Sequence, residues 1–194
     1  MATTGESGPL HLHRSRHGHP AVPRVIHVRR IVEPEPAAIE PLASLLQDVV
    51  HGGASVGFLA PLAASTATDY WRRVLGRLQD GLALWVAEDD GLIVGSVQLD
   101  RCGKENGRHR AEVQKLFVLS SHRGRGIASQ LMQAVEVHAR QVGCTLLVLD
   151  TLSDSAAAPV YRHLGWQYAG SIPRYAATPD GVLHATSCFY KLLD

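Results

Sequence analysis

Two carboxylates at the ends of neighbouring predicted strands are the residues of this chain best suited to chemistry. Glu112 lies at the start of one strand, and Asp150 ends the next strand along the chain, where ligands of a sheet tend to gather. Two carboxylates at one pocket would attract a cationic amine, and their mutual repulsion would raise the pKa of one of them toward that of a useful base. The alternative is that Glu112 pairs with a surface arginine and that Asp150 caps a turn.

A basic, glycine-containing turn lies between these carboxylates and precedes a predicted helix. The turn and the first helical residues are Arg123, Gly124, Arg125, Gly126, Ile127, Ala128 and Ser129. Amide N–H groups in a first helical turn lack intrahelical acceptors and carry a partial positive charge, and glycines let a phosphate approach them closely. The turn therefore predicts a diphosphate site. An ordinary strand-to-helix connection is the alternative, since neither the dinucleotide-fold nor the nucleoside-triphosphate glycine pattern is present.

Hydrophobic periodicity predicts the elements that position these residues. Residues 113–119 are mostly apolar and indicate a central strand, in which alternation would place one set of side chains on the same face: Glu112, Gln114, Leu116 and Val118. Behind the turn, apolar residues recur at intervals of three and four and predict a helix that Gly143 closes. Residues 145–150 then form the neighbouring strand.

The rest of the chain supplies further strands and helices around this unit. The predicted elements are a strand at 25–32, helices at 37–50 and 66–79, strands at 82–88, 92–99 and 168–172, a loop at 173–181 and a closing strand near 186–192. The resulting order is β-α-α-β-β-β-α-β-α-β-β, an α/β (α+β) class of fold in one domain over residues 25–194.

Composition excludes several classes of protein. A formal net charge of +1 argues against a nucleic-acid binder that depends on a broad basic field. No apolar run approaches a membrane span, and three widely separated cysteines favour reduced thiols in the cytoplasm. Residues 1–24 hold four of the eleven histidines and predict a disordered basic tail. A metal site there is the alternative.

Two motifs resemble those of the GNAT N-acetyltransferases. The first is the Arg/Gln-x-x-Gly-x-Gly/Ala signature, matched by Arg123, Gly126 and Ala128. The second lies in residues 154–166 and is matched by Ala157, Tyr161, Gly165 and Trp166, with Asp154 where the family usually has Asn. The resemblance covers about residues 26–193. It implies a mixed central sheet flanked by helices, with acetyl-CoA in a cleft beside the central strand and no metal.

The resemblance also implies roles for individual residues. Tyr161 would be the general acid for the coenzyme A thiolate, and the backbone of Phe117, Val118 and Leu119 would hold the pantetheine arm and the acetyl oxygen. His51 and Phe58 would line the acceptor pocket, although this segment could equally seal the core. The choice of Glu112 as the base rests instead on its place at the start of the central strand, where its carboxylate could receive the amine proton directly or through a water. Weaker candidates for substrate contacts, which rest on loop position, are Asp154, Tyr175, Asp180 and His184.

Local matches narrow the expected substrate. Residues 51–57, 111–116 and 177–181 are similar to the branch that contains the tabtoxin resistance protein and small aminoglycoside (kasugamycin-type) acetyltransferases. We therefore expect acetyl-CoA-dependent acetylation of a small cationic amine, giving resistance to an antibiotic or toxin, by a monomer or homodimer. The alternatives are a peptide or protein N-acetyltransferase and a non-catalytic coenzyme A-binding module that regulates a partner.

Overall fold

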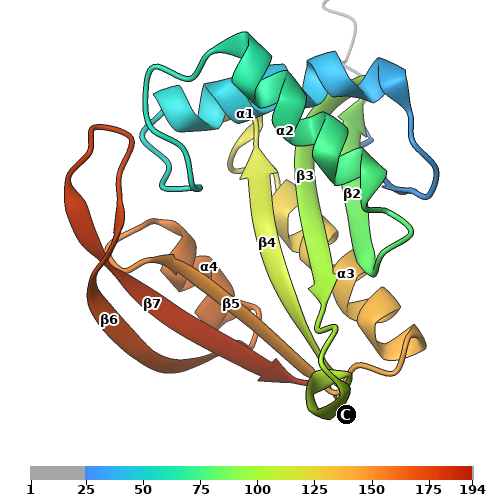
Figure 1. Cartoon of the computed structure of the whole chain (residues 1–194), viewed down its shortest axis with the longest axis vertical. Coiled ribbons are helices and arrows are strands. Elements are labelled where there is room, and N and C mark those ends of the chain that lie inside the picture. The colour runs from blue at the N-terminus through green and yellow to red at the C-terminus, as the bar shows by residue number, and fades with distance from the viewer. Residues whose placement is uncertain (1–24, 194) are drawn as a thin grey trace, which may run out of the picture.

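A seven-stranded sheet with helices on both faces forms the described part of the protein, residues 25–193 of a computed structural model (Figure 1). The strands are β1 (His27–Ile31), β2 (Leu82–Asp89), β3 (Leu92–Arg101), β4 (Arg110–Val118), β5 (Leu146–Leu152), β6 (Gln167–Ala177) and β7 (Leu183–Leu192). The helices are α1 (Ile39–His51), α2 (Ala64–Gly76), α3 (Ile127–Gln141) and α4 (Ala157–His163). The predictions for the tail and its histidines fall outside the described residues.

The strands lie in the order β1-β2-β3-β4-β5-β7-β6. Every neighbouring pair is antiparallel except β4 and β5, which are parallel and are joined through α3. A parallel pair requires such a crossover, because the chain must return to the end of the sheet at which β4 begins before it can start β5. The observed element order and the α/β class confirm the prediction from the sequence.

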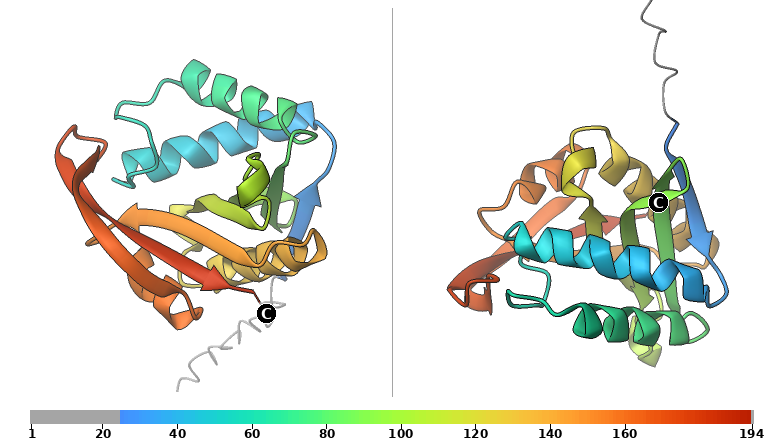
Figure 2. Two further views of the ribbon diagram at one scale, coloured as in Figure 1. Left: turned by 60° about the horizontal axis from the view of Figure 1, so that its bottom comes forward. Right: turned by 90° about the horizontal axis from the view of Figure 1, so that it is seen from above.

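Helices cover the two faces of the sheet in pairs, α1 and α2 on one side and α3 and α4 on the other (Figure 2). The spacing of the buried residues explains this arrangement, since those of α1 recur at intervals of three and four along one helical face: Leu42, Leu45, Leu46, Val49 and Val50. Strand β2 is buried along almost all of its length because both faces of the central sheet are covered.

A β-bulge interrupts β4 at Lys115. The register against β3 passes from Gln98 opposite Gln114 to Ser96 opposite Phe117, so that β4 contains one extra residue, and Lys115 has a φ of 56°. The bulge changes which side chains share a face. Glu112 and Gln114 face the α1–α2 side, whereas Leu116 and Val118 pack against the core beneath α3. The predicted common face for these four residues was therefore wrong, because alternation does not continue through a bulge.

Strands β4 and β5 separate soon after they pair. Their parallel pairing covers three positions and ends with Glu112 opposite Val148. Beyond that point β4 continues toward α1 while β5 turns away with β7 and β6 (Figure 1). The separation leaves the backbone edge of the upper part of β4 without a neighbouring strand.

Two predicted boundaries were wrong at the far edge of the sheet. Strand β6 extends from Gln167 to Ala177 and so includes Pro173, which had been expected to begin a loop, and β7 begins at Leu183 rather than near residue 186. Proline is tolerated because β6 is an edge strand and its pairing with β7 is irregular between Ile172 and Ala176.

Candidate active site

The basic turn ends in the N-terminus of α3, as expected. Gly126 is the N-cap with a φ of 74°, and Gly124 has a φ of 75°, a left-handed region that glycine adopts without strain. The first backbone bond of the helix runs from the Gln130 N–H to the Gly126 carbonyl, at 3.2 Å. The preceding amides, at Ile127, Ala128 and Ser129, therefore have no acceptor within the helix.

Space in front of these amides is open. A Cβ added to Gly124 or Gly126 would meet no other atom within 4 Å. Arg123 lines the adjoining cavity, and its Nε donates to the Val118 carbonyl at 3.4 Å. These amides and Arg123, three residues before the N-cap, are groups that could hold a diphosphate.

Arg125, the second arginine of the turn, has a different partner. Its Nη1 donates to Asp89 Oδ2 at 2.8 Å, and the Asp89 side chain is only 1% exposed. Asp89 ends β2 and is not among the residues that line the cavity. The two arginines therefore differ in role: Arg123 lines the cavity and Arg125 is engaged by a buried carboxylate.

A cleft of about 630 Å³ lies where β4 and β5 separate. It is bordered by β4, β5, α4, the end of β6 and the segment after α1. We call it the acceptor cleft and define it by its principal lining residues, which are Gly52–Gly57 of that segment together with Glu112, Gln114, Lys115, Phe117, Arg123, Asp150, Tyr161, Tyr175 and Thr186.

The two predicted carboxylates meet in this cleft. Leu147 and Leu149 are buried in the core beneath α3, so the alternation of β5 directs Asp150 to the opposite face, where Glu112 also lies. Both carboxylates reach solvent through the cleft. Partial burial, followed by the negative charges of Asp150 and Asp100, raises the pKa of Glu112 above its usual value. Burial also raises the pKa of Asp150, and the positive charge of Lys115 opposes that increase.

Lys115 was not identified from the sequence, yet it lies between these groups. Its Nζ donates to the Val56 carbonyl at 2.8 Å, and burial lowers its pKa while the charges of Asp150 and Glu112 oppose that change. A lysine in a strand of apolar residues offers no local signal for such a position. Only the bulge, which rotates Lys115 out of the regular alternation, brings its ammonium to the cleft.

Tyr161 enters the cleft from α4. Its ring packs against Trp166 and Phe189 at centroid distances of 6.2 and 5.9 Å, and the residue is 7% exposed. Burial and the negative charge of Asp150 raise the pKa of Tyr161 to about 12. The phenol therefore retains its proton at neutral pH and can donate it.

Of the three residues whose backbone was expected to bind coenzyme A, Phe117, Val118 and Leu119, only Val118 directs its backbone toward the cleft. The Leu119 N–H donates to the Val94 carbonyl of β3 at 2.8 Å, so this amide is already used. Alternation then directs the Phe117 backbone toward β3 and the Val118 backbone toward the edge facing β5. The bond from Arg123 to the Val118 carbonyl agrees with that orientation.

Two segments meet across the cleft. The Ser55 hydroxyl donates to the Ala177 carbonyl at 3.2 Å, and the Ala60 N–H donates to the Pro179 carbonyl at 2.9 Å. These bonds join the loop between α1 and α2 to the end of the β6–β7 hairpin, which Figure 2 shows side by side. Together with the bond from Lys115 to Val56, they hold this loop against the strands that border the cleft.

Some of the remaining predicted substrate residues line the cleft and others do not. Tyr175 lines the cleft. The His51 ring accepts a hydrogen bond from the Leu62 N–H at 3.1 Å, and Phe58 packs against Tyr70 at 5.3 Å, which agrees with the alternative that this segment seals the core. The cleft lining does not include these two residues, nor three others of the predicted set, Asp154, Asp180 and His184. Asp180 instead accepts from Thr178 within its own turn.

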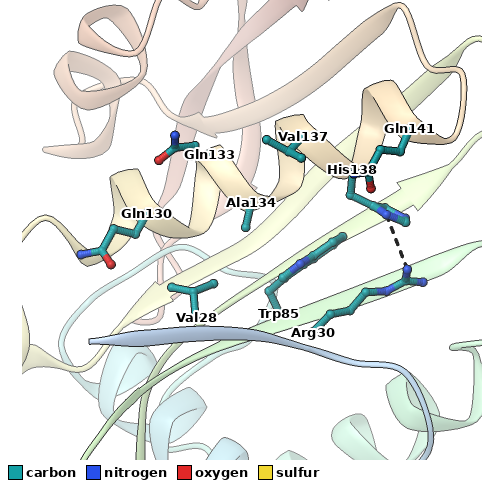
Figure 3. Close-up of a pocket in the computed structure, with 9 residues that line it drawn as sticks. All are labelled: Val28, Arg30, Trp85, Gln130, Gln133, Ala134, Val137, His138 and Gln141. Atoms are coloured by element: carbon teal, nitrogen blue, oxygen red, sulfur yellow. Dashed lines mark hydrogen bonds between the residues drawn. The ribbon is translucent and has the colours of Figure 1, made fainter. Parts of the chain in front are cut away.

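A second hollow, of about 580 Å³, lies between β1 and α3 (Figure 3). Its floor is Trp85, whose ring packs against both Arg30 and His138. Val137 and three glutamines of α3 border it. We call it the β1–α3 groove. It contains no residue of the basic turn or of the two carboxylates.

Across the described residues, 25–193, no cluster of three or more His, Cys, Asp or Glu side chains is arranged to hold a metal ion. Within the same span, no helix has the length and apolar character needed to cross a membrane.

Comparison with known proteins agrees with this geometry. The sequence model of the acetyltransferase (GNAT) family matches residues 56–166. An uncharacterized N-acetyltransferase from the hisH–hisA intergenic region of Azospirillum brasilense is 32% identical over 136 residues, covering 69% of this chain and 80% of that protein. N-acetyltransferase 8 of Rattus norvegicus is 40% identical over 92 residues, 46% of this chain, and the match spans only 41% of that protein's length.

A solved structure has the same fold. The structure of yncA from Salmonella typhimurium, determined with its cofactor acetyl-CoA, has a TM-score of 0.72 at 18% identity and covers 87% of this chain and 94% of that one. At this level of identity the likeness concerns the arrangement of the elements.

Proposed function

Because the chain belongs to the GNAT family and is an acetyl-CoA-dependent N-acetyltransferase, we propose that its acceptor is a small polar amine of an antibiotic or toxin. The observation that carries this proposal is the pair of carboxylates, Glu112 and Asp150, in a cleft bounded by two joined segments. Negative charge favours a cationic amine, and the joined segments favour a small molecule over a protein chain.

Acetyl-CoA supplies an acetyl thioester whose carbonyl carbon an amine can attack. We assign its diphosphate to the first-turn amides of α3 and to Arg123, since these amides have no acceptor within the helix and Arg123, close to them in the chain, lines the cleft. The edge of β4 at Val118 is then available to hold the pantetheine arm and the acetyl oxygen.

Glu112 is the proposed base. Glu112 is the last residue of β4 that pairs with β5, and it lines the cleft. There its carboxylate can accept a proton from the acceptor ammonium directly or through a water. Because its pKa is raised, Glu112 is a stronger base than an exposed glutamate and is better matched to the amine. Asp150 holds the amine through charge.

Tyr161 is the proposed acid. Its buried hydroxyl keeps a proton at neutral pH and lies on the cleft lining, so it can protonate the departing thiolate. No covalent attachment to the enzyme is required, because the amine and the thioester can be held side by side.

A thiol-release assay with a panel of acceptors tests the proposal. The purified protein is supplied with acetyl-CoA and with aminoglycosides including kasugamycin, small amine toxins, free amino acids and short peptides. We expect release of coenzyme A with at least one small polycationic or zwitterionic amine, confirmed by the mass of the acetylated product. Release with peptides alone would support a peptide N-acetyltransferase instead. Release with no acceptor, despite measured binding of coenzyme A, would support the regulatory module.

A further inference from the structure

Asp89 is a buried carboxylate that the reaction outlined above does not use. It is the last residue of β2, and its side chain is 1% exposed. Its Oδ2 accepts from Arg125 Nη1 at 2.8 Å and lies 3.3 Å from His122 Nε2. A carboxylate in such surroundings requires partners, because an unpaired buried charge is strongly unfavourable.

The two partners of Asp89 stand at opposite ends of the basic turn. His122 ends a short 3-10 helix (Ser120–His122), and Arg125 directly precedes Gly126, the N-cap of α3. One carboxylate oxygen therefore connects both ends of residues 122–125 to the end of β2. The side chain of Arg123, between these two ends, lines the acceptor cleft instead.

A turn of this composition needs such a connection. Gly124 and Gly126 both occupy left-handed backbone conformations, and glycine has more conformations to lose on folding than any other residue. The start of the segment is held from the other side, because the Ser120 N–H and hydroxyl both donate to the Asp48 carboxylate at 2.8 Å. Asp48 belongs to α1, so the turn is fixed between α1 and β2.

We propose that Asp89 is a positioning residue for coenzyme A, which holds Arg125 and His122 so that the α3 amides and Arg123 face the diphosphate. This inference rests on the assignment of the diphosphate to the α3 N-terminus. It also changes the expected role of Arg125, from a ligand of phosphate to the partner that fixes the turn.

Calorimetric titration of coenzyme A into Asp89→Asn, without any acceptor, tests the proposal. The variant keeps the shape and an acceptor oxygen but loses the charge. We expect the Kd for coenzyme A to increase about tenfold, because a displacement of the order of an ångström at a binding group has effects of this size or larger. The KM for acetyl-CoA should rise in parallel, while kcat at saturating acetyl-CoA and the KM of the acceptor stay within about twofold.

Glu136→Gln is the matched control. Glu136 is also a mostly buried carboxylate, 13% exposed and paired with Lys191 at 2.8 Å, but it lies in the middle of α3, away from the turn. We expect this variant to lower the melting temperature and to leave the Kd for coenzyme A unchanged. An equal rise of Kd in both variants would show a general effect of stability and would overturn the proposal.

A double-mutant cycle separates the two roles of Arg125. If Arg125 acts through Asp89, then Arg125→Gln and the double variant with Asp89→Asn raise Kd by the same factor as Asp89→Asn alone. Effects that multiply would assign Arg125 to the phosphate and overturn the proposal. Should Asp89→Asn not fold, His122→Gln takes its place, where a raised Kd supports the proposal and an unchanged Kd overturns it. Because these measurements need no acceptor, they remain informative even if the proposed acceptor class is wrong.

Discussion

The acceptor cleft and the β1–α3 groove are hollows of similar volume, about 630 and 580 Å³, built in different ways. The cleft opens because two parallel strands separate, and titratable side chains from β4, β5 and α4 converge in it. The groove is a depression between an edge strand and a helix, and its polar groups already contact each other.

Three residues of the groove contact one another. Arg30 lies over the Trp85 ring at 5.6 Å, Trp85 packs edge-on against His138 at 5.2 Å, and Arg30 Nη1 is 3.5 Å from His138 Nδ1. In the cleft, by contrast, the pKa values of Glu112 and Asp150 are raised by burial while both still reach solvent. Size does not distinguish the two hollows. The cleft brings together four groups with displaced pKa values, Glu112, Lys115, Asp150 and Tyr161, whereas the groove contains one, His138.

The largest expected effect is that of Glu112→Gln. Removing the base should lower kcat/KM by about a hundredfold to a thousandfold, with the Kd for coenzyme A unchanged, since the turn is untouched. Steady-state kinetics and calorimetry measure the two quantities. His138→Gln in the groove is the paired control, and turnover should be unaffected there. Near-normal turnover of Glu112→Gln would mean that the cleft carboxylate is no more important for activity than His138 in the groove, and would contradict the assignment of the base.

Tyr161→Phe should have the next largest effect. Loss of the proton donor should lower kcat by about tenfold to a hundredfold, while the KM of the acceptor changes little, because the ring and its packing against Trp166 and Phe189 remain. Comparing thiol release by wild type and variant at saturating substrates measures the change. An unaltered kcat would mean that the thiolate leaves without help from this phenol.

Lys115→Met should shift the pH profile rather than abolish activity. The ammonium lowers the pKa values of Glu112 and Asp150, so its removal raises them further. The base must be deprotonated, and activity therefore falls as pH decreases through its pKa. The acid limb of kcat/KM should move to higher pH, with a loss of about threefold to tenfold on that limb and of less than about twofold on the plateau at higher pH. Lys115→Arg should retain the wild-type limb; a limb that does not move in Lys115→Met would contradict this electrostatic role.

The smallest effect belongs to the groove and concerns stability. Burial, followed by the charge of Arg30, lowers the pKa of His138 below its usual value near 6.5. At this histidine the unfolded chain therefore binds a proton more readily than the folded chain. The free energy of unfolding is unaffected by this difference well above pH 6.5 and decreases as the pH falls below 6.5. The wild-type protein should lose more free energy of unfolding between pH 7 and pH 5.5 than the His138→Gln variant does. The difference should be at most about half a kcal/mol, after allowance for solvent screening. Denaturant titrations at the two pH values measure it, and an identical pH slope would argue against the shift.

Local patterns determined much of the fold. The order of strands and helices, the helix behind the basic turn and the glycines at its N-terminus were all predicted, because periodicity and turn composition act over a few residues. The candidate residues Glu112, Asp150 and Tyr161 were also found from the sequence, the first two from their places at strand ends and the third from a motif.

Contacts between distant residues decided the rest. The bulge at Lys115 depends on how β4 registers against β3, and that register then sets which side chains reach the cleft. Arg125 has the type and position of a phosphate ligand, yet it pairs with Asp89, which lies 36 residues away in the sequence. The extension of β6 past Pro173 likewise depends on its place at the edge of the sheet. Such pairings follow from the packing of whole elements, and no short stretch of sequence contains both partners.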